Sequence, residues 1–329
     1  MLSLTDWKPV LSLRLCVPML TWLACLSLGA VASGQEVVPG TGQQVSQVGD
    51  DFEDPEWVWQ ANLPKVSNNK DDMLSRNLPL GVSANGRWFE GSKRGQPDLV
   101  RRIATPHGGL AGSEGALALR TLHTGSSRPG YEQQQDDFIA NMAQSVGKIP
   151  VSQTPSVVTR VWLPPIDEWE NRTGCHFAFR LALETAPHRT EEPDGAYWPG
   201  MFINMYSKEG KGATGREHDV VYIWMKATNE SRRIEGPRIT MTGWWTLGMS
   251  VTPDGKIHYY AKPGVEDLTA EDHIASAWAF GYRAERMRSF FFNVCNGDDG
   301  RTWSTPFVID DPQLFVIPRS QANRGRPRR

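Results

Sequence analysis

The chain has 329 residues, of which 39% are hydrophobic and 22% charged, and its formal net charge is −2. This composition is typical of a folded protein, and the near-neutral charge argues against nucleic acid as a partner. The 31 glycines, 23 prolines and 13 tryptophans favour a turn-rich β architecture with many large side chains.

The first 32 residues differ in character from the rest. Lys8 and Arg14 precede an apolar run over residues 15–28, and the small residues 30–32 follow it. This order is typical of a secretory signal peptide cleaved after residue 32. A membrane anchor is the alternative interpretation, but the apolar run is shorter than the roughly 20 residues that span a bilayer. We therefore expect an exported mature chain without a transmembrane segment, located in the periplasm, the cell envelope or the extracellular space.

The mature chain divides into three regions. Residues 33–49 are mostly Gly, Gln, Val and Ser without periodicity, which predicts a flexible lead-in. Residues 318–329 carry five arginines among Gly and Pro, which predicts a basic disordered tail, either solvated or attached to an anionic surface or polymer. Residues 50–317 contain no internal repeat and no linker, so we expect them to form a single domain.

Long loops and short strands are expected over residues 63–109, which are rich in Asn, Gly, Ser and Pro. Residues 133–137 lead into either a short helix or an edge segment. From residue 157 onwards apolar and polar residues alternate in short runs separated by Gly, Pro, Asn and Asp, which predicts strands. These runs are 157–163, 177–183, 201–206, 220–226, 245–251, 257–261, 290–295 and 307–309. One helix is expected over residues 269–276, where Thr269 caps and Asp272 follows three residues later.

A hairpin motif lies in residues 243–260. Trp244 opens one strand, Asp254-Gly255 supplies a tight turn, and the returning strand ends in Tyr259 and Tyr260. This segment resembles the hairpin of laminin-G and concanavalin-A-like domains, and residues 49–54 resemble the first strand of many such proteins. The whole mature chain is similar to a group of large exported bacterial proteins that share this fold. The resemblance implies an all-β, two-sheet antiparallel jelly-roll sandwich with long loops, and it implies no catalytic residue.

Alternate residues of a strand face opposite sides of its sheet. One set is apolar and is expected in the core: Met201, Ile203, Met205, Val221, Ile223, Met225, Trp245, Leu247, Met249 and Val251. The other set mixes aromatic and polar side chains and is expected to form one open face: Phe202, Asn204, Tyr206, Tyr222, Trp224, Lys226, Trp244, His258, Tyr260, Phe291 and Asn293. Arg180 is a further candidate for this face.

Such a mixed face suits a sugar polymer, because pyranose rings stack on Trp and Tyr while hydroxyls bond Asn, His and Arg. The predicted ligand-binding residues are Arg180, Asn204, Tyr206, Tyr222, Trp224, Trp244, His258 and Asn293. We therefore expect a secreted carbohydrate- or polymer-binding protein. A glycoside hydrolase or polysaccharide lyase on the same fold is one alternative, and a structural cell-envelope protein is another, since aromatic pairs stabilise sheets without any ligand.

Catalytic and metal-binding motifs are incomplete, so the balance is against an enzyme. Glu217 and Asp219 match part of the Glu-x-Asp-x-x-Glu motif of concanavalin-A-like glucanases, but Tyr222 stands in place of the last Glu. Residues 296–303 match a single Asp-box, which predicts a turn, with Asp298 and Asp299 as candidates for a structural calcium ion. The seven histidines lack His-x-His and His-x-x-x-His spacings, so no zinc site is predicted.

Two cysteines, Cys175 and Cys295, remain after the signal peptide. Outside the cytosol they either form a disulfide across a long loop or stay as buried thiols. Their spacing does not decide between the two states.

Overall fold

The computed structural model describes residues 36–63, 65, 80–125, 134–185, 195–226, 233–278 and 283–318. The predicted signal peptide and tail residues 319–329 lie outside these ranges. Among the described residues, no helix is long and apolar enough to span a membrane.

Nearly all regular structure in these ranges is β-strand. The strands are β1 (Gln43–Gly49), β2 (Trp59–Gln60), β3 (Val82–Ser83), β4 (Trp88–Glu90), β5 (Leu99–Ala104), β6 (Gly115–Arg120), β7 (Gln134–Ala140), β8 (Ile149–Pro150), β9 (Ser156–Leu163), β10 (Gly174–Thr185), β11 (Ala196–Tyr197), β12 (Gly200–Tyr206), β13 (Val220–Lys226), β14 (Arg233–Ile239), β15 (Gly243–Val251), β16 (Lys256–Pro263), β17 (His273–Trp278), β18 (Ala284–Asn296) and β19 (Phe307–Val316). The helical turns are α1 (Met142–Ser145) and the 3-10 turns η2 (Val151–Gln153), η3 (Ile166–Glu168) and η4 (Ala270–Asp272).

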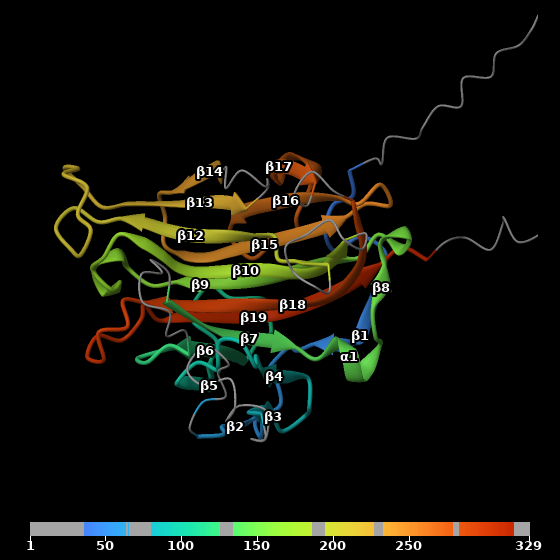
Figure 1. Ribbon diagram of the computed structural model, residues 1–329, viewed down its shortest axis with the longest axis horizontal. Coiled ribbons are helices and arrows are strands. Elements are labelled where there is room, and N and C mark those ends of the chain that lie inside the picture. The colour runs from blue at the N-terminus through green and yellow to red at the C-terminus, as the bar shows by residue number, and fades with distance from the viewer. Residues whose placement is uncertain are drawn as a thin grey trace, which may run out of the picture. The chain divides into compact units, whose positions relative to one another are not determined.

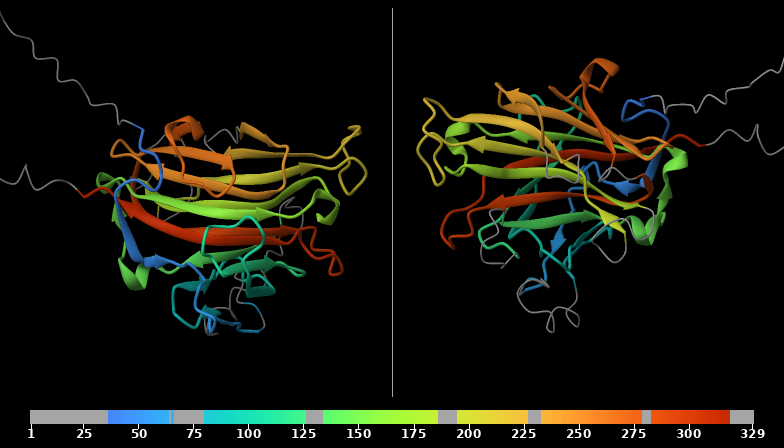
Figure 2. Two further views of the ribbon diagram at one scale, coloured as in Figure 1. Left: turned by 180° about the vertical axis from the view of Figure 1, so that it is seen from behind. Right: turned by 45° about the horizontal axis from the view of Figure 1, so that its top comes forward.

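The strands form two antiparallel sheets. Within the described ranges, sheet A has eight strands in the order β17-β16-β15-β9-β19-β6-β5, with β1 added on β19. Sheet B has eleven described strands in the order β14-β13-β12-β10-β18-β7-β4-β3-β2, with β11 on β10 and β8 on β18. Figure 1 shows sheet B in front of sheet A, and the left view of Figure 2 shows the molecule from behind, with sheet A in front. The prediction of an all-β, two-sheet antiparallel sandwich is confirmed.

The hydrophobic core lies between the sheets. The apolar set predicted from strand alternation is buried there, including Ile203 and Ile223 of sheet B and Leu247 and Met249 of sheet A. This part of the alternation prediction is confirmed, because each strand turns every second side chain toward the other sheet.

The hairpin between β15 and β16 is present as predicted. Thr252 and Lys256 close the turn through the backbone, and the side chain of Asp254 accepts from the Lys256 N–H at 3.2 Å. Gly255 has φ +79°, and a Cβ there would lie 2.6 Å from the Ala284 backbone, so this turn position requires glycine.

Two local expectations differ from the structure. Residues Gln43–Gly49 of the expected flexible lead-in form β1, which pairs with β19. That strand is stabilised by non-local backbone hydrogen bonds and by burial of Val48, which composition does not reveal. The expected helix at residues 269–276 is one 3-10 turn followed by β17. Thr269 and Asp272 form the predicted capping box, but the pairing of β17 with β16 ends the helical geometry.

Asp310 on β19 makes the stability of the fold depend on pH. It is 1% exposed and accepts a hydrogen bond from Ser113 Oγ at 3.0 Å. Burial, with the nearby carboxylates of Asp311 and Glu53, raises the pKa of Asp310 from 3.8 to about 7. In the unfolded chain this carboxyl ionises near pH 4, whereas in the folded chain it stays neutral up to about pH 7. Its contribution to the free energy of unfolding is therefore fully present below about pH 4 and is lost as the pH rises to about 7.

We expect Asp310→Asn to be more stable than wild type at pH 8 by about 2 kcal/mol, because a neutral side chain avoids the cost of burying a charge. Urea unfolding at pH 4 and pH 8 measures this difference. Equal pH dependence of wild type and Asp310→Asn would contradict the assignment.

Candidate ligand-binding face

The outer face of sheet B carries most of the predicted ligand-binding residues. This face comprises the side chains of sheet B that point away from the core, on strands β7, β10, β12, β13 and β18. The predicted residues on it are Arg180, Asn204, Tyr206, Tyr222, Trp224 and Asn293. Cross-strand register explains the grouping, since Phe202 pairs with Trp224, Asn204 with Tyr222, and Ala178 with Asn293.

Trp244 and His258 do not lie on this face, so the expectation of one common face is wrong for them and for Tyr260. Trp244 is on β15 and His258 on β16, both in sheet A, and their side chains point away from the core on the opposite side of the sandwich. Strand alternation distinguishes the two sides of a strand, but it does not tell which sheet the strand joins.

Two stacked pairs of rings run across β12 and β13. The rings of Phe202 and Trp224 are 4.1 Å apart and nearly parallel, at 4°. Those of Tyr206 and Tyr222 are 4.7 Å apart at 16°. Cross-strand aromatic pairs of this kind stabilise the sheet and form a flat apolar surface.

Arginine side chains cover these rings. The Arg233 guanidinium lies 4.6 Å from the Trp224 ring centroid, and that of Arg216 lies 4.6 Å from the Tyr206 ring. Trp224 is 8% exposed and Tyr222 6%. The prediction that these rings form an open face is therefore wrong, because arginine side chains in cation–π contact occupy the side of the rings where a sugar would stack.

Arg180 lies at the centre of the outer face. Its guanidinium is 5.2 Å from the ring centroids of both Phe202 and Phe291. Nη1 donates to Asn293 Oδ1 at 3.2 Å, and Nη2 donates to the Trp198 carbonyl at 2.7 Å. A Cβ at Gly200 would lie 2.4 Å from Arg180 Cγ, so the glycine leaves room for the arginine stem. Burial lowers the pKa of Arg180.

A polar network continues from Arg180 to β7. Asn293 Nδ2 donates to Asp137 Oδ1 at 2.6 Å, and Gln135 Nε2 donates to the same oxygen at 2.8 Å. Burial raises the pKa of Asp137, against the opposing effect of Arg180 and Arg94. The sequence prediction missed Gln135 and Asp137, because it treated residues 133–137 only as the lead into a short helix or edge segment at residues 138–146. The Gln135-x-Asp137 alternation is the signal that would have placed them on one face.

Two buried donors on this face have no hydrogen-bond partner among the described residues. They are Arg180 Nε and Trp224 Nε1. Neither group can accept a hydrogen bond, so a ligand that satisfies them must supply oxygen acceptors such as hydroxyls or carboxylates.

The remaining acidic candidates lie in loops. Glu217 and Asp219 are exposed, and Asp219 accepts from the Lys208 N–H at 2.6 Å. In the Asp-box loop, Asp298 has φ +47° and its carboxylate accepts from the Thr124 N–H at 2.9 Å. Asp299 accepts hydrogen bonds from its own loop, chiefly at Thr302, and these lower its pKa to about 2. Through these hydrogen bonds the carboxylates of Asp219, Asp298 and Asp299 stabilise the loops and turns around them.

Cys175 and Cys295 lie side by side in the same buried cluster as Phe202, Tyr222 and Trp224. Their Sγ atoms are 3.8 Å apart, and both side chains are buried. The fold thus brings together two cysteines that are 120 residues apart.

No protein-family model matches the chain, and no curated protein sequence matches it. Solved structures similar to it include a carbohydrate esterase from Shiga toxin-encoding bacteriophage phi24B, at 10% identity and TM-score 0.40 over 71% of this chain and 91% of that chain. An alginate lyase from Pseudomonas aeruginosa matches at 7% identity and TM-score 0.40, over 67% and 87%. The exoplasmic/lumenal domain of VIP36, in a Ca2+/Man3GlcNAc-bound form, matches at 11% and 0.34, over 73% and 89%.

The identities of these three matches are 7–11%, and their TM-scores are below 0.5. At such identities and TM-scores the likeness concerns the fold alone and transfers no activity.

Proposed function

We propose that the protein is an exported carbohydrate-binding protein that holds a sugar ligand on the outer face of sheet B, without catalysis. Arg180, Asn293 and Trp224 are its main ligand contacts. The observation that carries the proposal is the pair of buried donors, Arg180 Nε and Trp224 Nε1, that share this face and lack partners among the described residues. Leaving such donors unpaired costs about 1–3 kcal/mol each, which a ligand with oxygen acceptors recovers.

The arginines over the rings define how a ligand would bind. A sugar that stacks on Trp224 replaces the Arg233 guanidinium, which is then free to bond ligand hydroxyls from the side. Arg180 is held by Asn293 and Trp198 and is therefore oriented before the ligand arrives. Rigid contacts of this kind lose little side-chain entropy on binding.

A panel of polysaccharides tests the proposal, with binding and reducing-end release measured on the same samples of the exported chain. Trp224→Phe keeps the stacked ring but removes Nε1–H, and Arg180→Lys keeps the charge but removes Nε. We expect each change to weaken binding by about tenfold, the cost of one lost polar contact.

Trp244→Phe is the matched control, because Trp244 lies on sheet A and should leave affinity unchanged. Circular dichroism checks that all variants are folded. Unchanged affinity in both sheet B variants, or no binding to any polysaccharide, would overturn the proposal. Reducing-end release would instead favour a glycoside hydrolase or polysaccharide lyase.

A further inference from the structure

The first described residues cross the outer face of sheet A. The Val37 carbonyl accepts from Ser250 Oγ at 2.6 Å, and the Gly40 N–H donates to Ser156 Oγ at 3.3 Å. Pro39 packs on β15 at Gly248, where a Cβ would lie 2.8 Å from the proline ring. We call residues 36–41 the N-terminal strap. Its contacts bring Glu36 to β16 and to the edge strand β17.

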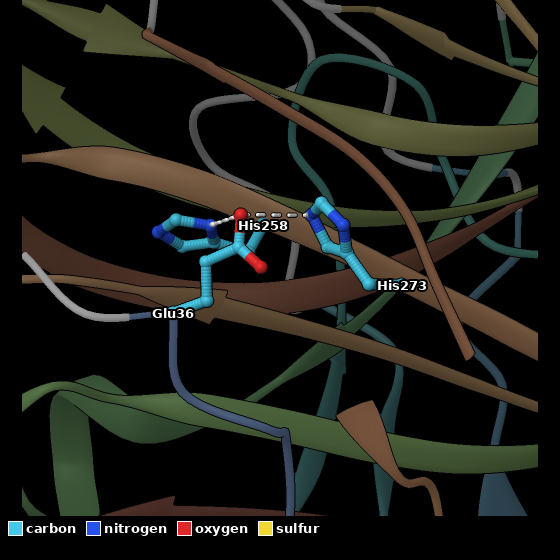
Figure 3. A group of neighbouring side chains, drawn as sticks. All are labelled: Glu36, His258 and His273. Atoms are coloured by element: carbon cyan, nitrogen blue, oxygen red, sulfur yellow. Dashed lines mark ion pairs between the residues drawn. The ribbon is translucent and has the colours of Figure 1, made fainter. Parts of the chain in front are cut away.

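Glu36 meets two histidines there, as Figure 3 shows. Glu36 Oε1 is 3.9 Å from His258 Nδ1 and 3.7 Å from His273 Nε2. The three ligand atoms all lie within 4.8 Å of one another. The two Glu36–histidine distances are too long for hydrogen bonds, yet the three ligand atoms are close enough together for one ion to approach all of them.

Among the described residues, one hydroxyl lies between Glu36, His258 and His273, and it belongs to Ser276. Ser276 Oγ lies 2.7 Å from His258 Nδ1, 2.8 Å from His273 Nε2 and 3.4 Å from Glu36 Oε1. A serine hydroxyl has a single proton, so it donates to only one of these acceptors at a time.

The far side of His258 fixes which ring nitrogen carries the proton. His258 Nε2 lies 2.9 Å from Thr252 Oγ1, and Thr252 Oγ1 donates to Asp254 Oδ1 at 2.6 Å. Thr252 Oγ1 also lies 3.2 Å from the Lys256 carbonyl, a second acceptor for its hydrogen, so we infer that His258 Nε2–H donates to Thr252 and that the Nδ1 lone pair points toward Ser276 Oγ. An N–H···O bond on the opposite nitrogen is the arrangement that orients metal-bound histidines.

We propose that Glu36, His258 and His273 form a binding site for a divalent transition-metal ion, with zinc as the expected occupant. Two imidazoles and one carboxylate suit zinc, copper or nickel, whereas calcium and magnesium require mostly oxygen ligands. Zinc at about 2.0–2.1 Å from each ligand would hold the donor atoms roughly 3.3 Å apart, so the two Glu36–histidine distances need to close by about half an ångström. Ser276 or water completes the coordination.

The site has a structural consequence. A bound ion would link the N-terminal strap to β16 and β17, and so attach the start of the mature chain to sheet A. Zinc binding is therefore expected to raise the melting temperature and to slow proteolysis ahead of β1.

Isothermal titration with ZnCl2 tests the site on the untagged exported chain, whose N-terminus is checked by mass spectrometry. We expect one zinc ion per chain and no heat with CaCl2. Glu36→Gln and His273→Ala should each weaken zinc binding by more than about tenfold. Both residues are partly exposed, so these variants are expected to fold. Co2+ bound in place of zinc should show visible ligand-field absorption that is lost in both variants.

The matched control is His218→Ala, which removes an exposed histidine from a loop outside the cluster. It should bind zinc as wild type does. Absence of zinc binding, unchanged affinity in Glu36→Gln and His273→Ala, or equal weakening in His218→Ala would each overturn the proposal.

Discussion

Replacing Trp88 by alanine is expected to lower the free energy of unfolding by about 4 kcal/mol, the largest loss we predict for a single core residue. Trp88 on β4 is fully buried. Its ring stacks on Phe138 at 4.5 Å and 14°, and it also contacts Phe290 edge-on at 5.7 Å. Alanine would leave a cavity among aromatic rings held by different strands, β7 and β18, and these rings cannot close the cavity without moving the backbone.

Trp88→Phe is the matched control. It keeps an aromatic ring against Phe138 and removes Trp88 Nε1–H, a buried donor without a partner among the described residues. We expect a loss below about 1.5 kcal/mol, because removal of the unpaired donor offsets part of the lost volume. Urea unfolding of both variants measures the two values. Similar losses for alanine and phenylalanine would show that stacking on Phe138 contributes little.

Replacing Arg180 by methionine is expected to cost about 3 kcal/mol at pH 7, although methionine retains the apolar stem. Arg180 lowers the pKa of Asp137 and connects to it through Asn293, by bonds of 3.2 and 2.6 Å. Without the Arg180 guanidinium, Arg94 is the remaining positive charge that favours the ionised Asp137 carboxylate, so the pKa of Asp137 rises further. The loss should therefore increase with pH as Asp137 ionises.

A double-mutant cycle separates this effect from lost packing. Asp137→Asn in the Arg180→Met chain should recover at least about 1 kcal/mol, because the uncompensated charge is removed. Free energies of unfolding of the two single variants and the double variant give the coupling directly. Additive losses would show that Arg180 and Asp137 act independently, and that the polar network is held by Asn293 and Gln135 alone.

The proposed sugar-binding face and the proposed zinc site lie on the outer sides of different sheets. Substitutions at Trp224 or Arg180 should therefore leave zinc affinity unchanged, while His273→Ala should leave sugar binding unchanged. This separation allows each proposal to fail without affecting the other.

The local pattern of the sequence determined much of the fold. Alternation of Met201, Ile203 and Met205 with Phe202 and Asn204 placed each side chain on the correct side of its strand, because the pleat repeats every two residues. Asp254-Gly255 determined the hairpin, because its turn needs a positive φ.

Only the tertiary structure decided which sheet each strand joins. This choice depends on hydrogen bonds between strands far apart in the chain, so Trp224 and Trp244, both predicted to face outward, point to opposite sides of the sandwich. It also decided that arginines cover the rings of sheet B, since cation–π partners such as Arg233 come from a neighbouring strand.

The proposed metal site could not be predicted from the sequence either. Glu36, His258 and His273 have no metal-ligand spacing, and they meet only because the N-terminal strap packs across sheet A beside the paired strands β16 and β17. Local periodicity follows from the geometry of a single strand, whereas a site assembled from three separate segments follows from their packing.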